Sequence, residues 1–121
     1  MKIAIPSETD AGLESMRSGH FGHAAYFTLV TFDDDMNVTE VESVKNVDHD
    51  VAGCGGVIDY VSGLNVDGIL AAGMGMPPFT RFTNAGVTVY SDRTEPNVGK
   101  VVELFAAGKV DPMDPSAACR H

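Results

Sequence analysis

The chain has 121 residues, of which 44% are hydrophobic, and its formal net charge is -9. This length and composition predict one domain with a single modest core rather than a disordered tail. The negative charge argues against a nucleic-acid-binding protein, because such proteins neutralise the phosphate backbone with Lys and Arg.

The amino end lacks the charged-then-apolar pattern of a signal peptide, and no apolar run approaches the roughly 20 residues needed to cross a bilayer. We therefore expect a cytoplasmic protein with no membrane partner. The two cysteines are Cys54 and Cys119. In a chain without a leader, cysteines are more often reduced than paired, which leaves buried inert thiols and metal ligands as the two interpretations.

The first half of the sequence predicts three strands. Residues 2–6 alternate and are rich in Ile, and residues 7–18 are polar and predict a loop. Residues 25–32 are dense in aromatic and β-branched side chains, and residues 38–44 alternate Val with polar residues. These last two strands should pair as a hairpin across the acidic turn at residues 33–37.

The second half predicts helices that alternate with strands. Residues 46–56 predict a loop that ends in a glycine-rich turn, Gly53-Cys54-Gly55-Gly56, followed by a helix to about residue 63. Residues 67–72 predict a buried strand that leads into a second glycine turn, Gly73-Met74-Gly75, and a helix through about Asn84.

The end of the chain completes this alternation. Residues 87–90 predict a strand and residues 97–107 a helix, whereas residues 109–121 predict a flexible tail. Alternating helices and strands imply right-handed crossovers and parallel pairing. We therefore expect an α/β fold over residues 1–121, with helices on a mixed sheet of about five strands. Ligands collect outside the carboxyl ends of parallel strands, so both glycine turns should emerge at that edge.

The first glycine turn predicts a site for an anionic, thiophilic ligand. A turn that opens a helix leaves free backbone N–H groups at the positive end of the helix dipole. Cys54 adds a soft thiol, and His49 adds an imidazole five residues earlier. The alternative is a small buried Cys54 and a solvated His49.

Other candidate ligands lie outside this turn. His20 and His23 flank Phe21-Gly22 and either converge on a metal or are ordinary surface and capping residues. Phe21 suits a core anchor and is also a candidate cofactor contact. Met74 has a thioether that suits Cu(I) but also fills core gaps. The last candidates are Cys119 and His121, at the very end of the chain. They are either ligands on a mobile lid or part of a frayed tail.

Enzymatic patterns are missing from the sequence. It has no Gly-x-Ser-x-Gly elbow, Walker loop or full dinucleotide fingerprint. Asp67 precedes a predicted strand rather than ending one, so the separated carboxylates of a two-metal nuclease are not in place. We therefore expect a protein that is not an enzyme.

Four segments occur in an order and spacing that resemble a known family: Ser18 to Phe27 with Gly19-His20-Phe21-Gly22, the turn at 53–56, Val66 to Gly75, and Gly86 to Tyr90. The chain resembles the dinitrogenase iron-molybdenum cofactor biosynthesis family over nearly its whole length. That family includes NifX, the carboxyl-terminal domain of NifB, and small stand-alone proteins of anaerobes such as the orange protein.

The resemblance implies a ribonuclease-H-like fold without nuclease chemistry, and the binding of a molybdenum- or iron-containing sulfide cluster. The orange protein carries a molybdenum-copper sulfide cluster, and this chain is similar to it in size. The position after Phe21-Gly22 is often Arg in relatives and is His23 here.

Two functions follow from the residues and the resemblance together. The first is the storage or carriage of an anionic metal-sulfur cluster, which would be received from or passed to a partner protein and would be absent from some preparations. The second is a small-metabolite or oxyanion sensor that uses the same pocket, with incidental cysteines. The backbone contacts would come from residues 53–56 and 73–75 in either case.

Overall fold

The computed structural model describes residues 1–19, 24–47, 49–72, 74 and 76–113, and for residues 49–55 it describes the backbone only. The elements follow the alternation that the sequence predicts. They are β1 (Lys2–Ser7), a 3-10 helix (Gly12–Glu14), β2 (Tyr26–Phe32), β3 (Val38–Lys45), α1 (His49–Ser62), β4 (Gly68–Ala71), α2 (Met76–Asn84), β5 (Thr88–Ser91) and α3 (Val98–Ala106).

The strands form one mixed five-stranded sheet in the order β3-β2-β1-β4-β5. β2 is antiparallel to both β1 and β3, so the predicted hairpin is confirmed. β4 is parallel to both β1 and β5, as the crossovers through α1 and α2 require. The predicted α/β fold with a mixed sheet is therefore confirmed.

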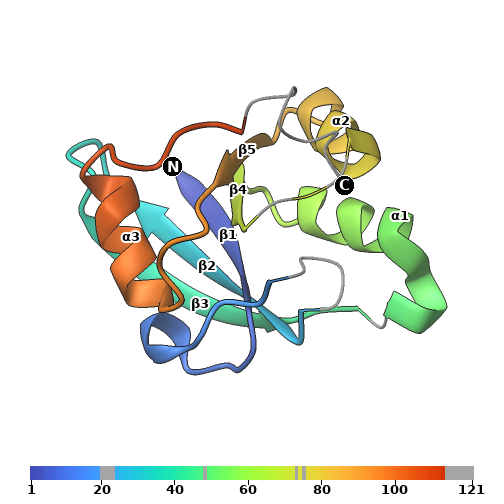
Figure 1. Ribbon diagram of the computed structural model, residues 1–121, viewed down its shortest axis with the longest axis horizontal. Helices are drawn as coiled ribbons and strands as arrows, with labels where there is room; N and C mark the ends of the chain where they lie inside the picture. Colours follow the sequence, from blue (N-terminus) through green and yellow to red (C-terminus); the bar gives the residue numbers. More distant parts are fainter. Residues whose placement is uncertain (20–23, 48, 73, 75, 114–121) are drawn as a thin grey trace.

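The helices cover both faces of the sheet, with α3 on one face and α1 and α2 on the other (Figure 1). The alternation of side chains along β1 sends Ala4 towards α1 and α2, and sends Ile3 and Ile5 towards α3. All three side chains are fully buried. Within the described part of the chain, no helix has both the length and the apolar character needed to cross a membrane.

The start of α1 corrects the sequence prediction. The helix begins at His49, so the predicted loop over residues 46–56 is wrong beyond its first residues, and Gly53 to Gly56 lie inside the helix rather than in a turn before it. Each glycine costs about 1 kcal/mol relative to Ala in a helix interior. Burial of Val57, Ile58 and Val61 against the sheet opposes this cost, because most helical stability in proteins comes from packing.

The packed part of the chain continues beyond α3, into the region that the sequence predicts as a flexible tail. The Met113 N–H donates to the Val89 carbonyl at 2.7 Å, and the Ser91 N–H donates to the Asp111 carbonyl at 3.2 Å. Val110 and Met113 are both buried. Residues 111–113 therefore pair with the outer edge of β5, and the packed chain extends at least to residue 113.

Candidate functional site at the carboxyl edge of the sheet

Four strands end at the same edge of the sheet, which we call the carboxyl edge. β1, β4 and β5 are mutually parallel, and β3 runs in the same direction because both β1 and β3 are antiparallel to β2. The chain leaves β3, β4 and β5 at this edge and enters α1, α2 and α3 within a few residues. Three helix amino termini therefore follow directly from one edge. The first N–H groups of a helix have no partner inside it and carry partial positive charge, which favours an anion. In α3 the Val98 N–H already donates to the Ser15 carbonyl and the Lys100 N–H to Asn97 Oδ1. An anion site is therefore expected at the starts of α1 and α2, which share the other face of the sheet.

A buried ion pair holds two loops together at the carboxyl edge. The Arg17 Nη1 donates to Asp92 Oδ2 at 2.9 Å and to the Glu95 carbonyl at 2.8 Å, and Nη2 donates to the Asp92 carbonyl at 2.8 Å. The two side chains are only 6% and 12% exposed. This pair ties the segment after β1 to the segment between β5 and α3.

The surroundings of the pair shift both pKa values downward. Burial lowers the pKa of the Arg17 guanidinium, although the charge of Asp92 opposes this effect. Burial by itself would raise the pKa of the Asp92 carboxyl. Hydrogen bonds from Thr94 and Glu95 and the Arg17 charge outweigh it and hold that pKa below its usual value. Asp92 is therefore an ionised structural group and not a candidate proton donor.

Buried hydroxyl groups line the sheet just below this edge. The Ser7 and Thr28 hydroxyls are 2.7 Å apart, and the Ser7 Oγ also lies 2.8 Å from the Ile5 carbonyl that accepts its proton. Both residues are fully buried. These bonds link β1 to β2 where the loop before β2 begins, and they give the site structural support rather than a reactive group.

An arginine that the sequence analysis missed stands at the end of β4. The Arg93 Nε donates to the Ala72 carbonyl at 2.8 Å, and the Ser91 hydroxyl donates to the same oxygen at 3.3 Å. Arg93 is exposed. The sequence signal for Arg93 is a cationic residue directly after the last predicted strand, in a chain that is acidic overall.

The structure places some of the predicted site residues. Gly53, Cys54, Gly55 and Gly56 lie in α1, between four and seven residues after His49. At a rise of 1.5 Å per residue they start about 6 Å from the beginning of the helix. Residues of a helix share a face when they are three or four apart, so positions 49 and 54 lie on different faces of α1.

Met74 packs in the same part of the core as the residues that follow the first glycine segment. Met74 is 5% exposed and belongs to the same hydrophobic cluster as Val57 and Ile58, which directly follow Gly56. Met74 and the residues that follow Gly56 therefore lie on the same face of the sheet. The Met74 thioether packs in the core, which favours its gap-filling interpretation.

The structure describes the remaining predicted residues either in part or not at all. For His49 and Cys54 the structure describes the backbone alone. Among the described residues, no group of three or more His, Cys, Asp or Glu side chains could hold a metal ion. The predicted residues that lie outside are His20, Phe21, His23, Gly73, Gly75, Cys119 and His121.

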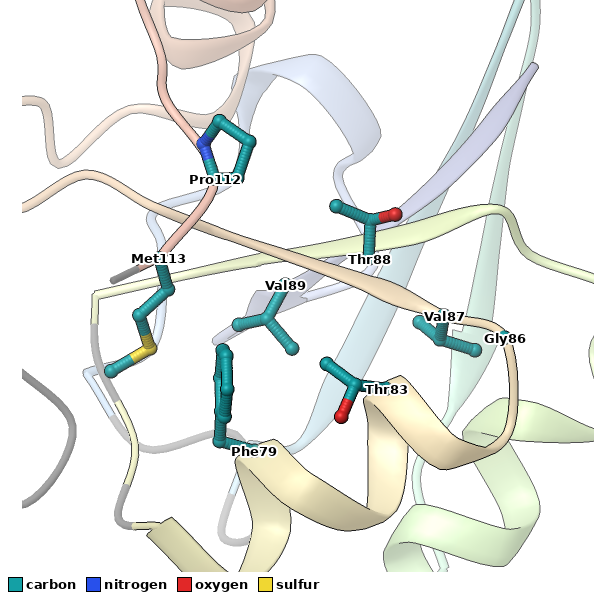
Figure 2. Close-up of a pocket in the computed structure, with 8 residues that line it drawn as sticks. All are labelled: Phe79, Thr83, Gly86, Val87, Thr88, Val89, Pro112 and Met113. Atoms are coloured by element: carbon teal, nitrogen blue, oxygen red, sulfur yellow. The ribbon is translucent and has the colours of Figure 1, made fainter. Parts of the chain in front are cut away.

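A pocket of about 260 Å³ opens between α2, β5 and the segment that pairs with β5 (Figure 2). Its lining includes Phe79, Val89 and Met113, with Thr83 and Thr88 as its polar side chains. A second hollow, of about 420 Å³, lies between α1 and α2. Neither pocket has thiol or imidazole groups in its lining, and both lie away from the carboxyl edge.

Comparisons with known proteins support the observed fold and indicate the family. Residues 1–108 match the family described as dinitrogenase iron-molybdenum cofactor. The crystal structure of PH0822 is 27% identical, with a TM-score of 0.79 over 93% of this chain and 96% of that one. The apo form of the orange protein from Desulfovibrio gigas is 24% identical, with a TM-score of 0.75 over 93% of this chain and 96% of that one.

No curated protein matches the chain. The likeness to the orange protein shows the fold alone, whereas the family match spans all the strands and helices described above. On that match, the chain belongs to the dinitrogenase iron-molybdenum cofactor family.

Proposed function

We propose that this protein binds an anionic metal-sulfur cluster, containing molybdenum or iron, at the carboxyl edge of its sheet and carries it between partner proteins. The observation that carries this proposal is that α1 and α2 both start at the carboxyl edge, on the same face of the sheet of an acidic protein. The family description supports the choice of metals. We propose a molybdenum-copper sulfide as one form of this cargo.

The helical position of the glycines changes how we expect the cluster to be held. Inside α1 the N–H groups of residues 53–56 have helical partners, so the donors without a partner inside the helix are those of the first turn, residues 49–52. Glycines have no side chain, so a bulky sulfide can approach the backbone of α1 closely at Gly53, Gly55 and Gly56. We propose Cys54 as the thiolate ligand on this helix.

Further contacts would come from the segments on either side. We propose that the loop before β2 and the segment before α2 close around the same cargo, and that the end of the chain supplies additional ligands. These proposed residues are His20, Phe21, His23, His49, Gly73, Gly75, Cys119 and His121.

Carriage without chemical change fits the nature of these donors. Backbone N–H groups have no charge to lose and hold a polyanion through many weak bonds. Such binding is tight in sum and reversible, since each bond is exchanged for one to water or to the next protein. We therefore propose a carrier and not an enzyme.

The direct test is purification under anaerobic conditions from a molybdenum-replete culture. The expected result is protein-bound molybdenum or iron with sulfide, and a charge-transfer band in the visible range. Protein that stays colourless and metal-free, also after incubation with tetrathiomolybdate and Cu(I), would contradict the proposal.

Cysteine variants separate the carrier from the sensor. Cys54→Ser should weaken cluster binding sharply, and Cys119→Ser reports separately on the end of the chain. If the double variant binds the same anion with unchanged affinity, the thiols are incidental and the sensor becomes the better description.

A further inference from the structure

We infer that the Arg93 guanidinium is an anion-binding group of the carboxyl edge, with its free Nη groups directed to a thioanion or oxyanion. The nature of the ligand as a metal sulfide rests on the proposed function, whereas the anion site itself rests on the contacts of Arg93.

The geometry of Arg93 is that of an anchored cation. Its Nε donates to the Ala72 carbonyl at 2.8 Å, which fixes one side of the planar guanidinium at the end of β4. The same carbonyl accepts a hydrogen bond from the Ser91 hydroxyl at 3.3 Å, so the anchor point is itself held. The guanidinium carries five N–H donors, and the four on Nη1 and Nη2 have no acceptor among the residues that the structure describes.

The nearby carboxylates do not form an ion pair with this cation. Asp92 Oδ2 accepts from Arg17, Thr94 and Glu95, and its Oδ1 accepts from the Thr94 hydroxyl. Glu95 Oε1 accepts from the Asn97 N–H. No described carboxylate lies within ion-pair distance of Arg93, although acidic residues outnumber basic ones in this chain by 17 to 8.

The other two described arginines are placed differently. Arg17 is buried and spends its Nη groups on the loop between β5 and α3. Arg81 lies on α2 and pairs with Asp59 of α1 at 3.2 Å, away from the carboxyl edge. Among the arginines that the structure describes, Arg93 therefore combines a position at the edge with free donors.

The chemistry of the group selects the ligand. A guanidinium presents its donors in a planar fork that matches two oxygens or sulfurs of one tetrahedral anion. Because Nε is already bonded, less side-chain freedom is lost when the anion binds. A lysine at this position would keep the charge but would lose both the anchor and the fork.

The test compares Arg93→Gln and Arg93→Lys with Arg81→Gln, which makes the same change in net charge away from the edge. Tetrathiomolybdate is titrated by visible absorbance, and sulfate by the ¹H–¹⁵N signal of the Arg93 Nε–H. Arg93→Gln should weaken tetrathiomolybdate binding about tenfold or more, as expected for charge-assisted hydrogen bonds. The affinity of Arg93→Lys for tetrathiomolybdate should lie between those of Arg93→Gln and the parent chain. Arg81→Gln should bind tetrathiomolybdate with the affinity of the parent chain.

The outcomes separate this inference from the proposed function. If Arg93→Gln binds tetrathiomolybdate as tightly as the parent chain does, the inference about Arg93 is wrong, but the proposed carrier function is not contradicted. If tetrathiomolybdate does not bind but sulfate shifts the Arg93 signal, the anion site stands and the cargo is wrong. If neither anion binds the parent chain, both proposals fall. Thermal unfolding of each variant establishes that Arg93→Gln is folded, as its exposed position leads us to expect.

Discussion

Replacing Arg17 by Met should destabilise the fold by about 3 kcal/mol, because it leaves the Asp92 carboxylate in place without its cation. Removing one member of a buried ion pair costs about 3–5 kcal/mol. The lower end applies here for two reasons. Asp92 keeps its hydrogen bonds from Thr94 and Glu95, and the Arg17 Nε is buried without a partner among the described residues, so the parent pair is itself imperfect.

Urea unfolding followed by circular dichroism measures this change. A loss of about 3 kcal/mol is a large part of the 5–15 kcal/mol typical of folded domains and should lower the melting temperature by about 10 °C. The matched control is Arg81→Met, which removes an exposed pair with side chains 49% and 76% exposed and should cost less than about 1 kcal/mol. Equal effects of the two variants would refute the argument.

The same pair predicts a pH dependence. The folded pKa of Asp92 lies below its ordinary value. Its carboxylate therefore stabilises the parent fold above about pH 4, and this contribution is lost as the pH falls through the folded pKa. The stability difference between the parent and Arg17→Met should accordingly shrink under acid conditions, because a protonated Asp92 no longer needs the cation. A difference that stays constant from pH 7 down to pH 3 would exclude Asp92 as its source.

Two further substitutions test the packing that supports the edge. Gly99→Ala should destabilise by about 1–3 kcal/mol in urea unfolding, because its Cβ would lie 2.8 Å from the Leu13 carbonyl oxygen. Gly63→Ala, whose Cβ meets nothing closer than 3.4 Å, is its control, and equal costs would contradict the packing argument. Ser7→Ala should cost about 1–3 kcal/mol by leaving the buried Thr28 hydroxyl without its partner. Adding Thr28→Val should restore much of that loss, and no recovery would show that the hydroxyl pair is not the cause.

The start of α1 shows where local sequence signals mislead. A cluster of glycines is typical of a turn, and local propensity opposes a helix over Gly53 to Gly56. The helix nevertheless runs through these glycines. Val57, Ile58 and Val61 bury one continuous face of α1 against the sheet, and this packing stabilises the helix more than the glycines destabilise it. The expected free donors therefore move from the glycines to the first turn of α1.

Arg93 shows the complementary case of a residue with no local pattern. Nothing near it in the sequence indicates that its Nε reaches the Ala72 carbonyl, twenty-one residues earlier in the chain. The same holds for Arg17 and Asp92, which are seventy-five residues apart. Hydrogen bonds of this kind form only when the crossovers bring the ends of β4 and β5 and the loop after β1 to the same edge.

By itself, the sequence determined the alternation of strands and helices, the mixed sheet and the family resemblance, because periodic burial and the spacing of short motifs are local properties of the chain. The strand order confirms that parallel strand ends share one edge, and this edge was predictable from the crossover rule alone. Only the tertiary structure decided which charged groups meet there and which are already paired. Long side chains find their partners through space, and the distances involved depend on how all five strands and three helices pack.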